Sequence, residues 1–159
     1  MAEEKKKKKM CIIVSKGTLD AAYPPLILAS TAASMDWEVH LFFTFYGLDI
    51  INKKKNKSLK VAPIANPAMP MPVPNIIGML PGMTAMATMM MKRMMKKGNV
   101  PSIEELINMC REMGVRFYGC QMTMDVMGIS EEDLIPVDAC LGAAGYLDIA
   151  SDADVNLFI

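Results

Sequence analysis

VRFYGCQMTMDVMG, residues 115–128, joins a strand-forming sequence to a helix-forming one. Branched and aromatic residues dominate its first part, which favours an extended, packed chain. Gly119 is expected to break that strand, and the residues from Gln121 onward favour a short helix. Cys120 is therefore predicted between a strand end and a helix start, where open α/β sheets bind ligands.

Two interpretations of Cys120 follow from this placement. The positive end of a helix lowers the pKa of a thiol and favours the nucleophilic thiolate. A free cysteine is also often a small buried hydrophobic residue without chemistry. The placement alone leaves both open.

The amino-acid composition indicates a folded globular protein and limits the partners that can be expected. The chain has 159 residues, of which 52% are hydrophobic and 21% charged, and this predicts one folded domain with a sizeable core. Its formal net charge is zero, so charge gives no reason to expect nucleic acid as a partner. Residues 1–9 are charged and the apolar run after them is short, so no signal peptide is predicted.

The cysteines and the single histidine indicate free thiols rather than disulfides or a metal site. The four cysteines form no C-x-x-C pair, and His40 is the only histidine, so we predict no metal site. Neither a dinucleotide-binding nor a P-loop fingerprint is present, and we predict no cofactor. His40 is either a catalytic base or, more simply, a packed residue in a strand. Free thiols suit a reducing cytoplasm.

The domain organisation follows from the alternation of short apolar strands and helical stretches. Residues 1–9 are expected to be a disordered basic tail, and residues 10–159 a single α/β domain with a Pro/Met-rich insertion at about 61–98. We predict a three-layer α/β/α sandwich around a mostly parallel five-stranded sheet. Asp138 is predicted to cap a last helix over 139–150, which would place Cys140 in a first turn with a lowered thiol pKa.

The insertion has two parts. Six prolines between 61 and 81 exclude a regular helix or an inner strand, and a methionine stripe follows on one helix face, at positions 79, 83, 86, 90 and 94. We favour packing of this helix on its own core or in a homo-oligomer. Contact with a partner or with a membrane surface through residues 76–97 stays open. We expect the segment 63–98 to cover the Cys120 crevice or to form an interface beside it.

The sequence YGCQMTMDVMG, residues 118–128, resembles the cysteine motif of the DsrE/DsrF-like superfamily. It is most similar to the DsrE-related branch whose members are often labelled peroxiredoxin family proteins. Supporting similarity extends over almost the whole chain, including KGTLD at 16–20, FFTFYG at 42–47 and LFI at 157–159. The resemblance implies a flavodoxin-like sandwich and participation in sulfur transfer.

The resemblance also implies a role for Cys120. The family's active cysteine carries sulfane sulfur as a persulfide and exchanges it with small carrier proteins of the TusA type, and the motif maps that role to Cys120. The supporting residues are Gly119, Gln121, Thr123, Lys16 and Thr18. Cys140 is a candidate second thiol, although a cysteine there is not part of the family pattern.

Three classes of function therefore remain. The leading one is a sulfurtransferase or sulfur-relay protein in the cytoplasm, with membrane association open. A thiol peroxidase is the second, but no P-x-x-x-T-x-x-C loop occurs and the residues before Cys120 favour a strand. The third is a non-catalytic binding module that uses the methionine-rich helix, with Cys120 as a core residue.

Overall fold

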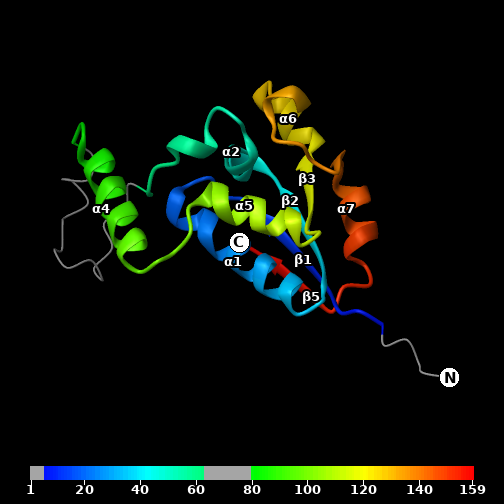
Figure 1. Cartoon of the computed structure of the whole chain (residues 1–159). Helices are drawn as coiled ribbons and strands as arrows, with labels where there is room; N and C mark the ends of the chain where they lie inside the picture. Colours follow the sequence, from blue (N-terminus) through cyan, green and yellow to red (C-terminus); the bar gives the residue numbers. More distant parts are fainter. Residues whose placement is uncertain (1–5, 63–79) are drawn as a thin grey trace.

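The computed structural model describes residues 6–62 and 80–159, and a five-stranded sheet lies at its centre (Figure 1). The strand order is β4-β3-β2-β1-β5, and every neighbouring pair is parallel. The strands are β1 (Lys9–Val14), β2 (Glu38–Phe43), β3 (Arg116–Cys120), β4 (Ala139–Leu141) and β5 (Val155–Phe158). The predicted five-stranded parallel sheet is confirmed.

Helices cover both faces of the sheet. The first face carries α1 (Leu19–Ser34) and α5 (Ile103–Glu112), and the second carries α7 (Ala143–Ala150). Among the described residues, the remaining α-helices are α2 (Leu48–Ile51), α4 (Met83–Lys97) and α6 (Gln121–Met127), and the short 3₁₀ helices are η1 (Phe45–Gly47), η2 (Asn56–Ser58) and η3 (Glu131–Asp133). The chain is thus an α/β/α sandwich, as expected.

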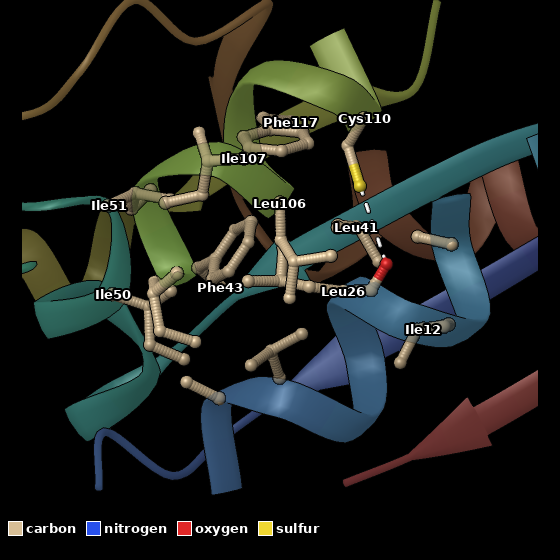
Figure 2. Close-up of a cluster of buried hydrophobic side chains, with 14 of the residues drawn as sticks. Ile12, Leu26, Leu41, Phe43, Ile50, Ile51, Leu106, Ile107, Cys110 and Phe117 are labelled. Atoms are coloured by element: carbon tan, nitrogen blue, oxygen red, sulfur yellow. Dashed lines mark hydrogen bonds between the residues drawn. The ribbon is translucent and has the colours of Figure 1, made fainter. Parts of the chain in front are cut away.

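Alternation along the strands divides the core in two. On the first face the buried side chains include those of Ile12, Leu41, Phe43 and Phe117, packed against α1 and α5 (Figure 2). The Cys110 thiol lies in this layer and donates to the carbonyl oxygen of Leu26 at 3.4 Å. The second face holds a smaller cluster, made of Cys11, Phe42, Tyr118, Cys120, Tyr146 and Ala150. The two layers exclude water from both sides of the central strands.

The prediction of a helix over 139–150 is wrong in its first part. The first three residues form β4, which pairs with β3, and Gly142 occupies the N-cap position of a shorter helix. Asp138 instead joins the start of β4 to β3 through two hydrogen bonds. Its carboxylate accepts from the Phe117 N–H at 2.8 Å, and its own N–H donates to the Phe117 carbonyl oxygen at 2.8 Å. A three-residue strand is too short to show the alternation by which strands are recognised.

Gly119 does not break β3, which continues through Cys120. Glycine is needed here because there is little room for a side chain at this position on the first face of the sheet. A Cβ atom at this position would lie 3.2 Å from the Met124 sulfur and 3.3 Å from the Leu134 Cδ1. Glycine therefore lets α6 and the loop after it pack tightly beneath the strand that carries Cys120.

Within the insertion the structure describes residues 61–62 and 80–98, which contain α4. Residues 63–79, including Met79 of the predicted stripe, lie outside the described residues. Ala87, Met91 and Met95 pack against the first core cluster. Large methionine side chains remain exposed on the outer side of the helix, at Met86, Met89, Met90 and Met94. In Figure 1, α4 and α6 lie well apart with α2 between them, and Cys120 is the N-cap residue of α6, so α4 does not cover Cys120. Among the described residues, no helix combines the length and apolarity that a membrane span requires.

Candidate functional site

Cys120 is the last residue of β3 and stands at the N-cap position of α6. Its side chain belongs to the second-face cluster, beside Tyr118 and Phe42, and the residue is only 5% exposed. The predicted position between a strand and a helix at the carboxyl edge of the sheet is therefore confirmed. The burial is greater than a freely accessible nucleophile would show.

Hydrogen-bond donors surround the Cys120 sulfur. Burial acts to raise the pKa of this thiol, but the hydroxyl and N–H of Thr123, the Thr44 hydroxyl and the Met122 N–H lie around the sulfur as polar groups that favour the thiolate, and together they outweigh the effect of burial. The pKa of Cys120 consequently lies below the ordinary thiol value. Because α6 has only seven residues, these individual donors rather than a long helix dipole account for the effect.

The two threonines lie side by side at the site. Thr44 directly follows β2, Thr123 lies in the first turn of α6, and their hydroxyl oxygens are 3.1 Å apart. The Phe45 N–H donates to the Thr123 hydroxyl at 3.3 Å. Phe45 reaches this position with a φ of 46°, a left-handed conformation that costs a non-glycine residue about 1–2 kcal/mol. Local strain of this kind persists where the surrounding structure imposes it.

Two glycines hold the turn after β2 in place. A Cβ atom at Gly17 would overlap the carbonyl oxygen of Tyr46, and one at Gly47 would overlap the carbonyl oxygen of Val14. The loops after β1 and β2 thus lie backbone against backbone, and the Gly47 N–H donates to the Ser15 carbonyl at 3.2 Å. This close contact fixes the direction in which Thr44 and Phe45 leave β2.

Thr44 was not among the residues predicted for the site. It lies in the sequence FFTFYG, residues 42–47, whose aromatic residues on both sides of Thr44 favour a strand that continues past it. The strand ends at Phe43 instead, and the polar residue inside an otherwise aromatic run is the only sequence signal for the turn. Thr123, which was predicted, lies at the sulfur.

Gln121, Lys16 and Thr18, the other predicted supporting residues, form no hydrogen bond with the Cys120 sulfur. The Gln121 side chain donates to the Asp125 carboxylate at 2.8 Å on the exposed side of α6. Lys16 and Thr18 follow β1, which lies two strands from β3, and Thr18 occupies the N-cap position of α1 without a side-chain capping bond. They belong to the same edge of the sheet as Cys120 but to a different part of it.

Cys140 lies close to Cys120 along the sheet but faces the other way. Cys140 pairs with Gly119, and Cys120 pairs with Leu141. The Cys140 sulfur would lie 3.6 Å from a Cβ at Gly119, on the first face. Burial and the nearby Glu131 carboxylate raise the pKa of Cys140, contrary to the predicted lowering in a helix turn.

Cys11, Cys110 and His40 are buried, and burial shifts the pKa of each. Burial raises the pKa of Cys11 to about 11 and that of Cys110 to about 12, so both stay protonated at neutral pH. His40 lies inside β2, where Nδ1 is 3.1 Å from the Tyr118 hydroxyl and Nε2 is 2.7 Å from the Glu38 carboxylate. Burial lowers the pKa of His40, and both ring nitrogens are engaged away from Cys120. Within residues 6–62 and 80–159, no cluster of His, Cys, Asp or Glu has the arrangement of a metal site.

The thiol of lowered pKa at the end of β3 and the parallel sheet around it can be compared with known proteins. The model of the DsrE/DsrF/DrsH-like family matches residues 6–158. The chain belongs to this family. Its similarity to the sulfur carrier protein DsrE2 of Allochromatium vinosum is 47% identity over 158 residues, which is 96% of this chain and 98% of that protein. It is also 34% identical over 162 residues to the uncharacterized protein YrkE of Bacillus subtilis, covering 96% and 97% of the two chains.

Solved structures of low sequence similarity share the fold of this DsrE/DsrF-like chain. The YchN protein of E. coli matches with a TM-score of 0.50 and 11% identity, covering 96% of this chain and 99% of that one. The protein MTH1491 of Methanobacterium thermoautotrophicum matches with a TM-score of 0.54 and 11% identity, covering 95% and 99%. These similarities concern architecture alone. The resemblance inferred from the Cys120 motif is confirmed at the level of family and fold.

Proposed function

We propose that this chain is a sulfur-relay protein that carries sulfane sulfur as a persulfide on Cys120. The observation that carries the proposal is the convergence of Thr44, Met122 and Thr123 donors on one thiol whose pKa they lower. The 47% identity to a protein named sulfur carrier protein DsrE2 supports the same role. The acceptor we propose is a small sulfur-carrier protein of the TusA type.

The proposed reaction is a pair of thiolate displacements. In loading, the Cys120 thiolate attacks the outer sulfur of a donor persulfide, an S–S bond forms, and the donor leaves as a thiolate. In discharge, the acceptor's thiolate attacks the outer sulfur on Cys120, and the electron pair of the broken S–S bond returns to Cys120. No net oxidation or reduction occurs in either step. Both steps need a thiolate that is stable as nucleophile and as leaving group, which the donors around Cys120 favour.

The surface around the site supports a protein as the acceptor. Large apolar side chains from the turn after β2 and from α6 are exposed there, at Phe45, Tyr46, Met122 and Val126. Met122 and Val126 lie one turn apart on the same helix and so share a face. Exposed apolar groups that gather beside a nearly covered thiol are typical of a docking surface. We therefore place the carrier protein against this rim.

Mass spectrometry after exposure to a sulfane-sulfur donor tests the proposal. Incubation with thiosulfate, polysulfide or a persulfidated carrier should add about 32 Da per sulfur atom to Cys120. Cys120→Ser should lose the adduct, and Cys140→Ser should keep it as the matched control. An undiminished adduct in Cys120→Ser that maps to Cys140 would show that the site is wrongly assigned.

The transfer step needs a second measurement. Loaded protein mixed with a TusA-type carrier should lose the added mass while the carrier gains it, and a carrier whose cysteine is replaced by serine should gain nothing. Peroxide consumption with a rate first-order in protein, without transfer, would instead favour the thiol peroxidase alternative. An unreactive Cys120 in the native protein would favour a non-catalytic binding module.

We also propose that the outer face of α4 mediates contact between copies of this chain. Four methionines on this helix are exposed, while Ala87, Met91 and Met95 already pack on the core. Apolar surface that is not used within the chain is a common cause of association. A membrane surface would also accept this face, because Lys96 and Lys97 lie in the last turn beside the methionines.

A further inference from the structure

Few hydrogen-bond acceptors are available to the hydroxyl groups of Thr44 and Thr123. Thr44 is 9% exposed and Thr123 is 2% exposed, so water does not serve as a ready acceptor for either. Among the described residues, these hydroxyls form two hydrogen bonds with protein oxygen and nitrogen atoms. One joins the two hydroxyls, at 3.1 Å, and in the other the Phe45 N–H donates to the Thr123 hydroxyl at 3.3 Å. Buried hydroxyl protons nevertheless need an acceptor.

Counting the hydroxyl protons of Thr44 and Thr123 shows that one of them is available to the Cys120 sulfur. Each hydroxyl has one proton to donate and two lone pairs to accept with. If Thr44 donates to Thr123, the Thr123 proton is left for the Cys120 sulfur, and if Thr123 donates to Thr44, the Thr44 proton is left for it. In both cases one hydroxyl proton reaches the sulfur and the other is held between the two oxygens.

The held proton acquires a second acceptor when the persulfide forms. A persulfide adds a sulfur about 2 Å from the first. Hydroxyl oxygens 3.1 Å apart are spaced so that each can donate to one of two adjacent sulfur atoms. A hydrogen bond to a charged acceptor is about twice as strong as one between neutral groups, so exchanging the Thr–Thr bond for a bond to an anionic sulfur is favourable.

We propose that Thr44 and Thr123 form a two-hydroxyl clamp that recognises the persulfide rather than the thiolate of Cys120. In the unloaded state one hydroxyl donates to the Cys120 sulfur and the other is bound to its neighbour. In the loaded state the bond between the hydroxyls opens and each donates to one sulfur of the persulfide. This inference rests on the proposed sulfur-relay function and assigns Thr44 as a positioning residue of that site.

The clamp predicts an unusual pattern among variants. A single Thr44→Val change leaves Thr123 to donate to the thiolate, so the pH midpoint of Cys120 alkylation should shift little. The same change removes the second donor of the persulfide, so the equilibrium constant for loading from a small persulfide should fall roughly five-fold, the usual effect of one hydrogen bond. The double change Thr44→Val with Thr123→Val should raise the alkylation midpoint and weaken loading further.

The experiment measures both quantities in the full-length chain. Alkylation by iodoacetamide as a function of pH reports the thiolate, and mass spectrometry after equilibration with cysteine persulfide reports loading. Thr44→Ser keeps the hydroxyl and should restore loading to the wild-type level. Thr31→Val, a change of the same kind on α1, should alter neither quantity, and thermal melts should identify any variant that does not fold.

Three results would overturn the clamp. One is a single Thr44→Val shift of the alkylation midpoint as large as that of the double variant, since the hydroxyls would then act independently on the thiolate. The second is unchanged loading in a folded Thr44→Val variant. The third is a wild-type chain that does not load at all, which rejects the sulfur-relay function as well. The alkylation profile separates these cases, because it measures the hydroxyl bonds to Cys120 without any persulfide.

Discussion

The side chains of Cys120 and Cys140 lie on opposite faces of the sheet, although the two residues belong to neighbouring strands. The register pairs Cys120 with Leu141 and Cys140 with Gly119, so alternation turns the two thiols away from each other. Cys120 packs with the second-face cluster and Cys140 against the first. The persulfide that we propose on Cys120 would therefore be protected from the thiol on the neighbouring strand, which could otherwise form a disulfide with Cys120 and expel the outer sulfur.

Mild oxidation tests this relationship. In the native protein, diamide should not produce a Cys120–Cys140 disulfide, because the strand would have to rotate to bring the sulfur atoms within bonding distance. The same treatment in denaturant should allow the bond, which serves as the control. Peptide mapping by mass spectrometry distinguishes the two. A native Cys120–Cys140 bond formed at the rate of the denatured sample would show that β4 detaches readily from β3.

The four thiols should also differ in their pH dependence. Donor groups lower the pKa of Cys120, whereas burial raises the pKa values of Cys11, Cys110 and Cys140. Alkylation of Cys120 should therefore have a midpoint below the reference thiol pKa of about 8.5, and the other three should have midpoints above it. Site-resolved mass spectrometry of the native protein gives each profile. A Cys120 midpoint above the reference would contradict the donor arrangement.

Alkaline pH should destabilise the fold through its buried thiols. The pKa of Cys110 is raised to about 12 by burial, so the unfolded chain loses this proton at lower pH than the folded one. The stability associated with the protonated thiol is complete below the unfolded pKa of about 8.5 and declines as pH rises, by about 1.4 kcal/mol per pH unit until the folded group titrates. Denaturant melts between neutral and alkaline pH measure the slope.

Cys110→Ala is the matched variant for the alkaline experiment. It removes the titrating group and its bond to the Leu26 carbonyl, so it should be less stable at neutral pH. The stability of this variant should fall less steeply with pH than that of the parent, because the variant lacks the Cys110 thiol, whose proton is lost at lower pH in the unfolded chain than in the folded one. Equal slopes for the two proteins would show that Cys110 ionises alike in the folded and unfolded states.

Much of this arrangement could be predicted from local sequence. The apolar runs that became β1 and β2 and the capping box of Ser102 and Glu105 at the start of α5 are strong signals, and the structure contains all of them. The strand before Cys120 and the helix after it were likewise visible in residues 115–128. Such features depend on neighbours within one or two turns, which the sequence displays directly.

The features that were missed depend on distant partners. Gly119 is required because α6 and the Leu134 loop fold back beneath it, and no local pattern shows that contact. Thr44 joins the site only because the turn after β2 leaves toward α6. The three residues of β4 form a strand because β3 offers them an edge. In each case the deciding interaction is tertiary, and a single sequence does not reveal it.

The glycine contacts between the loops after β1 and β2 lead to a further test. Gly17→Ala should push the turn that carries Phe45 and Tyr46 away from β1, because the added methyl overlaps the Tyr46 carbonyl oxygen. We expect a loss of about 1–3 kcal/mol in stability, typical of overpacking, and a higher alkylation midpoint for Cys120. Gly98→Ala is the control, since its Cβ would meet no atom closer than 3.5 Å. An unchanged midpoint in a destabilised Gly17→Ala protein would separate the turn from the thiol.

The exposed methionines of α4 provide the last prediction. Replacing Met86, Met89, Met90 and Met94 together by glutamine keeps the side-chain length and helix propensity but removes the apolar surface. If this face joins copies of the chain, the variant should have a smaller mass in light scattering while its circular dichroism stays that of the folded parent. Each of the four replacements should change the stability of the separated chain by no more than about 0.5 kcal/mol, because these side chains are exposed.

Met91→Gln is the contrasting substitution on the same helix, because Met91 packs against the core. It should lower stability by about 1 kcal/mol or more without a direct effect on the interface, since it buries an amide without a partner. Binding to anionic vesicles, measured by co-sedimentation for the parent and the four-methionine variant, distinguishes lipid contact from subunit contact. A parent that has the mass of a single chain and binds vesicles only when the methionines are present would reject the interface between copies and assign the α4 face to a membrane surface.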